Sequence, residues 1–206
     1  MLEEGLARYL SAEQRQRLAA ARVGIAGCGG LGSNVAMMLA RSGVVRLLLI
    51  DGDRVEPSNL NRQHFFPRHL GEAKATALAA QLRELRPGMQ VREQVLWLER
   101  GNIPALLPEA DIWVEALDNP TMKRDFVECA LEAGAFVVSA SGVAGWGGPP
   151  MQRRDFGDRL ILVGDFATGI DVHPPLAPRV TQAAALQADA VLERILGPAG
   201  TGAALG

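Results

Sequence analysis

The chain has 206 residues, a formal net charge of −2 and two cysteines. Its length suffices for one domain with a good core, and its charge gives no electrostatic reason to bind nucleic acid or an anionic membrane. The cysteines, Cys28 and Cys129, are too few for a disulfide framework or a zinc site of their own. Residues 1–21 lack the apolar core of a signal peptide, and no apolar run is long enough to cross a bilayer, so we expect a cytoplasmic protein.

The first elements combine a charged segment with two short apolar runs. We expect a helix over residues 2–21, then a strand over 23–26 that leads into a glycine-rich turn. The next helix, over 33–42, is almost wholly apolar and should be buried, with Gly43 as its C-cap. The order strand, glycine turn, helix is the first sign of a nucleotide site.

A second unit follows directly. The continuous apolar run over 45–50 predicts a parallel strand covered on both faces. The polar loop over 52–70 is too long for a simple connection, which favours a functional loop. A helix over 72–86 is ended by Pro-Gly at 87–88, and residues 91–98 alternate well enough for a strand.

The rest of the chain repeats the alternation of helix and strand. In order, we expect a short helix over 103–107, a strand over 112–116, a helix over 120–133 and a strand over 136–140. A strand over 160–163 and a terminal helix over 181–196 follow. The segments 141–150 and 164–178 are interpreted as loops over the sheet. Strands that alternate with helices predict a doubly wound α/β fold.

The glycine turn is a candidate anion site. Gly27, Gly29 and Gly32 fit the G-x-G-x-x-G spacing, and Asp51 at the end of the next strand is an acid that can hold ribose hydroxyls. Glycines let the backbone approach a phosphate, and the helix N-terminus offers unpaired N–H groups. The alternative is a tight turn without a ligand.

Polar residues beyond this acid strengthen the case. Asp53, Asn59, Asn61 and Arg62 lie in the long loop, and Arg62 is suited to bind phosphate oxygens with two hydrogen bonds. Each residue alone is more simply a solvated loop residue, whereas the block as a whole favours a site.

Two further charged residues lie at helix starts. Lys74 in a first helical turn opposes the helix dipole, which a bound anion would offset; a solvated lysine is an equal alternative. Asp118 follows a strand at the sheet edge where ligands bind and could hold Mg²⁺ together with substrate phosphates. The alternative is that 118–120 only begins a helix.

These motifs together resemble the ThiF/MoeB/HesA family, the bacterial relatives of ubiquitin-activating enzymes. The matching stretches lie at 27–33, 51–63, 71–74 and 115–119, and the run Ser-Asn-Leu-Asn-Arg-Gln within 58–63 is highly specific. Residues 163–165, 177–180 and the final helix resemble the short form of ThiF, the sulfur carrier protein adenylyltransferase.

The resemblance implies a fold and a reaction. The fold would be a Rossmann-like, doubly wound, mostly parallel sheet with antiparallel strands toward the C-terminal end. It would be a single ThiF-type nucleotide-binding domain over 1–206, with an N-terminal helix over 1–21 and a disordered tail over 198–206. The C-terminal glycine carboxylate of a small ubiquitin-like sulfur carrier would attack the α-phosphate of ATP and release pyrophosphate.

The resemblance also implies a role for each site residue. Asp51 would bind the ribose hydroxyls, Arg62 and Lys74 the phosphates and Asp118 the Mg²⁺, and Gly29 and Gly30 would lie against the nucleotide. Gly27 and Gly32 of the same turn and Asp53 would belong to the same nucleotide site, and Asn59 and Asn61 would make supporting phosphate or loop contacts. Arg62, Lys74 and Asp118 would be the catalytic set.

Partners and cofactors follow from the same resemblance. The carrier would be a β-grasp protein that ends in Gly-Gly and acts in thiamin thiazole synthesis, and the enzyme would be a homodimer. An arginine from the partner subunit's N-terminal segment often completes family sites, and Arg8, Arg15 and Arg17 are candidates. Because the chain has no C-x-x-C pair, we expect no structural zinc, and because residues 164–178 hold no cysteine, we expect no covalent carrier adduct there.

Other functions remain open. The carrier could serve molybdopterin or cysteine synthesis, or the carboxylate could belong to threonylcarbamoyl-adenosine in tRNA, which the near-neutral charge disfavours. An NAD-dependent oxidoreductase is disfavoured because Tyr9 is the only tyrosine and no substrate domain is visible. A non-catalytic scaffold should have lost Arg62, Lys74 or Asp118.

Overall fold

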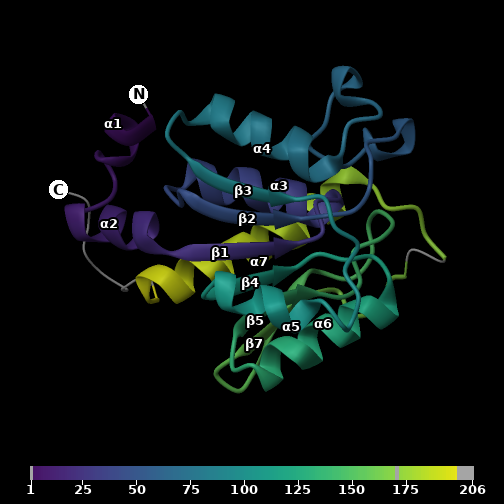
Figure 1. The fold of residues 1–206 in the computed structure, drawn as a ribbon. Helices are drawn as coiled ribbons and strands as arrows, with labels where there is room; N and C mark the ends of the chain where they lie inside the picture. The colour runs from purple at the N-terminus through teal and green to yellow at the C-terminus, as the bar shows by residue number, and fades with distance from the viewer. Residues whose placement is uncertain (1, 170–171, 199–206) are drawn as a thin grey trace.

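The computed structural model describes residues 2–169 and 172–198, and a seven-stranded sheet forms its centre (Figure 1). The strands are β1 (Arg22–Ala26), β2 (Arg46–Ile50), β3 (Gln90–Gln94), β4 (Ile112–Glu115), β5 (Phe136–Ala140), β6 (Gln152–Phe156) and β7 (Leu160–Gly164). Their order is β3-β2-β1-β4-β5-β7-β6, and all neighbours are parallel except β6 and β7. This confirms the predicted Rossmann-like, doubly wound sheet with an antiparallel pair toward the C-terminal end.

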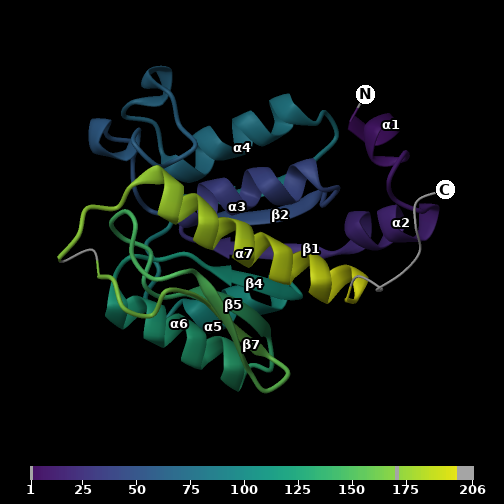
Figure 2. The ribbon, with the colours of Figure 1, turned by 180° about the vertical axis from the view of Figure 1, so that it is seen from behind.

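Helices cover both faces of the sheet. They are α1 (Leu2–Leu6), α2 (Ala12–Ala20), α3 (Gly30–Arg41), α4 (Lys74–Leu85), α5 (Ile103–Leu106), α6 (Pro120–Glu132) and α7 (Ala177–Leu196), with 3₁₀ turns at Pro57–Asn59, Pro67–His69 and Leu107–Glu109. Figure 2 shows α3 and α7 across one face, and Figure 1 shows α5 and α6 on the other. The buried residues accordingly form one core under α3, α4 and α7 and a second one under α5 and α6.

The ends of three central strands are level with one another. Ala26 of β1 pairs with Ile50 of β2 and with Glu115 of β4. The residues that follow these strands therefore meet at one edge of the sheet, the carboxyl edge where open α/β sheets bind ligands.

The N-terminal segment differs from the sequence prediction. A continuous helix over 2–21 is wrong, because α1 ends at Leu6 and α2 starts after Ser11. Ser11 Oγ accepts from Gln14 N at 3.1 Å, and Gln14 Oε1 accepts from Ser11 N at 2.8 Å. This reciprocal capping box starts a new helix.

Other boundaries shift by a few residues. The strand expected over 91–98 ends at Gln94, and the terminal helix begins four residues early, at Ala177. Gly43 follows α3 with φ of +111°, as expected for the glycine that ends a helix. Residues 199–206 of the predicted tail lie outside the described residues. Within the described part of the chain, no helix combines the length and the apolarity needed to cross a bilayer.

Candidate active site

The glycine turn joins β1 to α3 through contacts that only glycine permits. Gly27 has φ of +94°, and a Cβ added there would lie 2.7 Å from the Ala116 carbonyl oxygen. A Cβ on Gly32 would lie 1.9 Å from the Gly27 carbonyl oxygen, so the helix could not approach the strand as closely. Gly29 is the N-cap of α3 and offers no side-chain cap, which leaves the helix N-terminus available to an anion.

Asp51 joins this turn to the long loop. Its Oδ2 accepts from Cys28 N at 2.6 Å and its Oδ1 from Asp53 N at 2.7 Å. Burial raises the pKa of Asp51, while the two backbone hydrogen bonds and the Lys74 charge oppose that rise. The carboxylate thus fixes the relative position of turn and loop as well as lining the cavity described below.

Lys74 is buried rather than solvated. It is the first residue of α4, its side chain is only 9% exposed, and its Nζ lies 2.7 Å from Asp53 Oδ2. The alternative of a lysine extended into water is therefore wrong. Asp53 holds the ammonium at the helix start, where its charge opposes the dipole.

Both the backbone and the side chain of Arg62 are fixed by hydrogen bonds. Its carbonyl oxygen accepts from Asn34 Nδ2 at 3.0 Å, and its Nη1 donates to Ser58 O at 3.0 Å and to Asn61 Oδ1 at 2.9 Å. Burial lowers the pKa of the Arg62 guanidinium, and the charge of Asp118 opposes that shift.

One cavity of about 700 Å³ brings these groups together, a volume typical of small-ligand sites. Eight of the predicted site residues line it: Gly27, Gly29, Gly30, Asp51, Asp53, Arg62, Lys74 and Asp118. Figure 1 shows the loops that follow the strands gathered at the end of the sheet opposite α1 and α2.

Three predicted residues do not line the cavity. Gly32 packs against Gly27, as described above. Asn59 is buried and its Oδ1 accepts from Glu56 N at 3.0 Å, while Asn61 Nδ2 donates to Pro175 O at 3.1 Å. These residues shape the loop that carries Arg62.

The cavity also has walls that sequence reasoning missed. Gln63 lines it, and its Oε1 is buried with no hydrogen-bond partner among the described residues. Trp97 lies over Gly52, where an added Cβ would be 2.6 Å from the indole ring. Lys123 and Thr168 also line the cavity. Gln63 belongs to the motif over 51–63 and was a readable signal, whereas the others come from segments that only the fold brings together.

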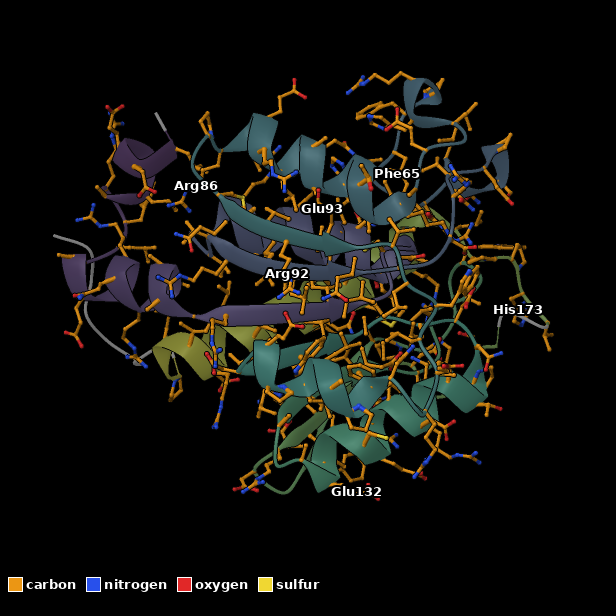
Figure 3. All side chains as sticks on the ribbon, viewed as in Figure 1. Phe65, Arg86, Arg92, Glu93, Glu132 and His173 are labelled. Carbon is orange, nitrogen blue, oxygen red and sulfur yellow. The ribbon has the colours of Figure 1, made fainter. Side chains whose placement is uncertain are left out.

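The candidate N-terminal arginines lie away from the cavity. Arg8, Arg15 and Arg17 belong to the segment that leads into the amino end of β1, and Arg17 Nη1 donates to Leu196 O at 3.1 Å. Figure 3 labels Arg86, at the end of α4 beside α1, and His173 at the opposite end of the molecule. Within one chain, Arg8, Arg15 and Arg17 therefore lie at the end of the sheet opposite the cavity.

The motif-bearing cavity lies at the carboxyl edge of a mostly parallel sheet, the place where open α/β folds bind ligands. The ThiF family model matches residues 4–202, so the chain belongs to the ThiF family.

Two named relatives show how far the likeness extends in sequence. The "adenylyltransferase and sulfurtransferase uba4" of Aspergillus fumigatus is 37% identical over 133 residues, which cover 64% of this chain and 27% of that protein. The bovine "adenylyltransferase and sulfurtransferase MOCS3" is 36% identical over 156 residues, covering 71% and 34%. The chain thus spans about a third or less of the length of these two relatives.

Solved structures share the fold. E. coli tRNA N6-threonylcarbamoyladenosine dehydratase, TcdA, in complex with ATP matches with a TM-score of 0.84 and 22% identity, over 94% of this chain and 93% of that one. E. coli MccB with ATP matches with a TM-score of 0.71 and 28% identity, over 88% and 58%. At 22% identity, the first likeness concerns the fold alone.

Proposed function

We propose that this chain is an ATP-dependent adenylyltransferase that activates a carboxylate with release of pyrophosphate. The observation that carries the proposal is the single cavity in which a glycine turn, Asp51, Arg62, Lys74 and Asp118 meet. Membership of the ThiF family supports it, as do the adenylyltransferase names of the relatives.

The electrostatic problem of the reaction matches the charges of the cavity. A carboxylate must approach a triphosphate, and both are anions, so the approach is slow unless the charges are neutralised. Arg62 and Lys74 would bind phosphate oxygens, and the start of α3 would supply backbone N–H groups. Because phosphoryl-centre substitution depends mainly on positioning and charge, these groups suffice without a protein nucleophile.

The residues present also fit Mg²⁺. Asp118 is exposed and lines the cavity, and Mg²⁺ in nucleotide sites is commonly held by one or two carboxylates plus phosphates. No group of three potential ligands among His, Cys, Asp and Glu occurs in the described residues, so a cage built of protein alone is not offered there. Bound at Asp118, the ion would neutralise phosphate charge.

We propose a small ubiquitin-like sulfur carrier that ends in Gly-Gly as the substrate, and a ThiS-like carrier of thiamin thiazole synthesis as its first candidate. The "sulfurtransferase" in the names of uba4 and MOCS3 supports a carrier of sulfur, without deciding between pathways.

A second copy of the chain is part of the proposal. Arg8, Arg15 and Arg17 lie at the amino end of the sheet, so only another subunit could bring one of them to the cavity. We therefore propose a homodimer in which an N-terminal arginine crosses to the partner's site.

The test is carrier-dependent ATP–pyrophosphate exchange. The purified chain is assayed with a panel of β-grasp proteins ending in Gly-Gly, and the same carriers without the last two glycines are the controls. Exchange with an intact carrier alone supports the proposal. Exchange driven only by threonylcarbamoyl-adenosine tRNA would move the function to tRNA, and binding of NAD in place of Mg²⁺–ATP by calorimetry would refute adenylation.

A further inference from the structure

A buried acid lies directly behind the cavity wall. The Glu115 side chain, at the end of β4, is 0% exposed. Removing a carboxylate from water costs several kcal/mol unless it is paired and hydrogen-bonded. Its Oε1 accepts from Leu117 N at 2.7 Å, and its Oε2 accepts from Lys123 Nζ at 2.6 Å and from Ser139 Oγ.

The contacts of Glu115 with Leu117, Lys123 and Ser139, called the brace below, close around the turn that carries Asp118. The chain leaves β4 at Glu115, turns through Leu117 and Asp118, and enters α6 after Asn119, whose Oδ1 caps the helix. Lys123, at the end of the first helical turn, then returns to the Glu115 carboxylate. Both sides of the turn that carries Asp118 are therefore tied to one buried group.

The neighbouring strand and helix fix that group in turn. Ser139 belongs to β5, which pairs with β4, and its hydroxyl donates to Glu115. Gln187 of α7 donates its Nε2 to the Glu115 carbonyl oxygen at 2.9 Å. The brace is thus anchored in the sheet and in the helix behind it.

We propose that Glu115 is a positioning residue for Asp118, and that Lys123 and Ser139 hold its carboxylate in place. This inference rests on the proposed function, because Asp118 has a chemical role only if the cavity binds a metal–nucleotide. Stability alone gives no reason for the pair, since well-packed apolar residues of similar volume often replace a buried ion pair without loss. Instead, the Glu115–Lys123 pair fixes the conformation of the turn and thereby the direction in which the Asp118 carboxylate points.

The test replaces the two charged side chains of this pair by apolar side chains of similar volume. The double variant Glu115→Leu/Lys123→Met leaves no unpaired buried charge, so we expect it to fold, but it removes the acceptor for the Leu117 N–H. Hydrogen exchange of the Leu117 amide, followed by NMR, should become faster. Because Lys123 lines the cavity, the affinity of the same variant for a non-hydrolysable ATP analogue without metal is measured first and is the reference for the metal effect.

The decisive readout is the gain in analogue affinity that Mg²⁺ provides, measured by calorimetry. Loss of a partner that orients a metal-binding group commonly lowers metal affinity by about 10- to 100-fold, so the gain should shrink by that factor. A folded double variant with the wild-type Mg²⁺ gain and a wild-type rate of pyrophosphate exchange would overturn the inference. Should the double variant not fold, Ser139→Ala removes one donor only, and an unchanged Mg²⁺ gain in it would overturn the inference equally.

A matched control lies at the other end of the same strand. Asp111, directly before β4, pairs with Arg22 on the surface. Asp111→Asn should change neither the Leu117 amide nor the Mg²⁺ gain. Failure of the proposed function is distinguishable, because it would appear in the wild-type protein as absent Mg²⁺–nucleotide binding or absent exchange, whereas failure of the inference would appear in the variants alone.

Discussion

Arg62 and Asp118 carry two of the opposite charges that line the cavity, and each is expected to be indispensable. In the proposed reaction, Arg62→Ala would remove a phosphate ligand and Asp118→Ala the carboxylate for Mg²⁺, so each should abolish carrier-dependent pyrophosphate exchange. Losing such a group commonly lowers a rate by about 100-fold or more. Both side chains are partly or largely exposed, so the thermal unfolding midpoint should stay close to that of the wild type. Wild-type exchange in either variant would remove that residue from the mechanism.

Trp97 offers an optical report on the same cavity. Its side chain is 69% exposed and lies over Gly52, next to Asp51, so a nucleotide whose ribose is bound at Asp51 should alter its surroundings. We expect ATP to change the intrinsic fluorescence of the wild type and to leave Trp97→Phe unchanged. Trp113 is buried in the core and should give a constant background, and Trp146, which is exposed and does not line the cavity, is replaced by Phe in both proteins. An equal ATP response in both proteins would show that Trp97 does not border the nucleotide.

At the scale of elements, the approach of α3 to β1 depends on Gly32. A Cβ there would lie 1.9 Å from the Gly27 carbonyl oxygen, so Gly32→Ala must push the helix away or distort the turn. Overpacking of this kind costs about 1–3 kcal/mol, and nucleotide affinity should fall with stability. Gly101→Ala is the control, because an added Cβ meets nothing within 4 Å. Chemical denaturation and calorimetry of both variants would check the difference.

A buried ion pair ties two loops to the start of α7. Asp165 accepts from Arg179, from Thr168 N at 2.8 Å and from Thr168 Oγ1 at 2.7 Å, while Arg179 Nη1 donates to Gly147 O at 2.6 Å. Burial opposes ionisation, yet the hydrogen bonds prevail and lower the pKa of Asp165. A carboxylate with a depressed pKa stabilises the fold above its unfolded pKa of about 3.9 and loses this contribution as the pH falls further.

Asp165→Asn should therefore be destabilised most at neutral pH, by about 3–5 kcal/mol, because it leaves a buried cation without its partner. The difference from the wild type should shrink as the pH falls below the unfolded pKa of about 3.9 and toward the lower pKa of the native carboxylate, which then also takes up a proton. Urea unfolding at several pH values would measure it. A difference that is constant down to about pH 2 would contradict the assigned pKa direction.

The elements differ in how far the sequence determines them. The central parallel strands β1, β2, β4 and β5 could be predicted because their largely apolar runs are buried on both faces. β6 could not, because all of its residues are exposed and no alternation marks it. The break between α1 and α2 was readable, since Ser11 and Gln14 form the S-x-x-Q signature of a helix start.

The residues of the candidate site also differ in how far the sequence predicts them. The glycine turn and the loop up to Gln63 lie in compact motifs, so their residue types and spacing are enough to predict a site. Trp97, Lys123 and Thr168 reach the cavity from three separate segments, and no local pattern records that meeting. The partner of Lys74 was equally hidden, because Asp53 lies 21 residues away in sequence.

At the scale of the whole molecule, the sheet separates the cavity from the candidate N-terminal arginines. Its carboxyl edge carries the cavity, and its amino edge carries α1 and α2 with the candidate arginines (Figure 1). If an N-terminal arginine crosses to a partner's cavity, as proposed, the reaction requires assembly of two copies.

The route of an oxygen atom tests the central claim most directly. A carrier labelled with ¹⁸O in its C-terminal carboxylate is incubated with the chain, Mg²⁺–ATP and a sulfur nucleophile, and the AMP formed is analysed by mass spectrometry. If the carboxylate attacks the α-phosphate, one of its oxygens stays on phosphorus when the acyl group leaves, so AMP should carry one ¹⁸O. Unlabelled AMP, or ADP as the sole nucleotide product, would contradict adenylation at this cavity.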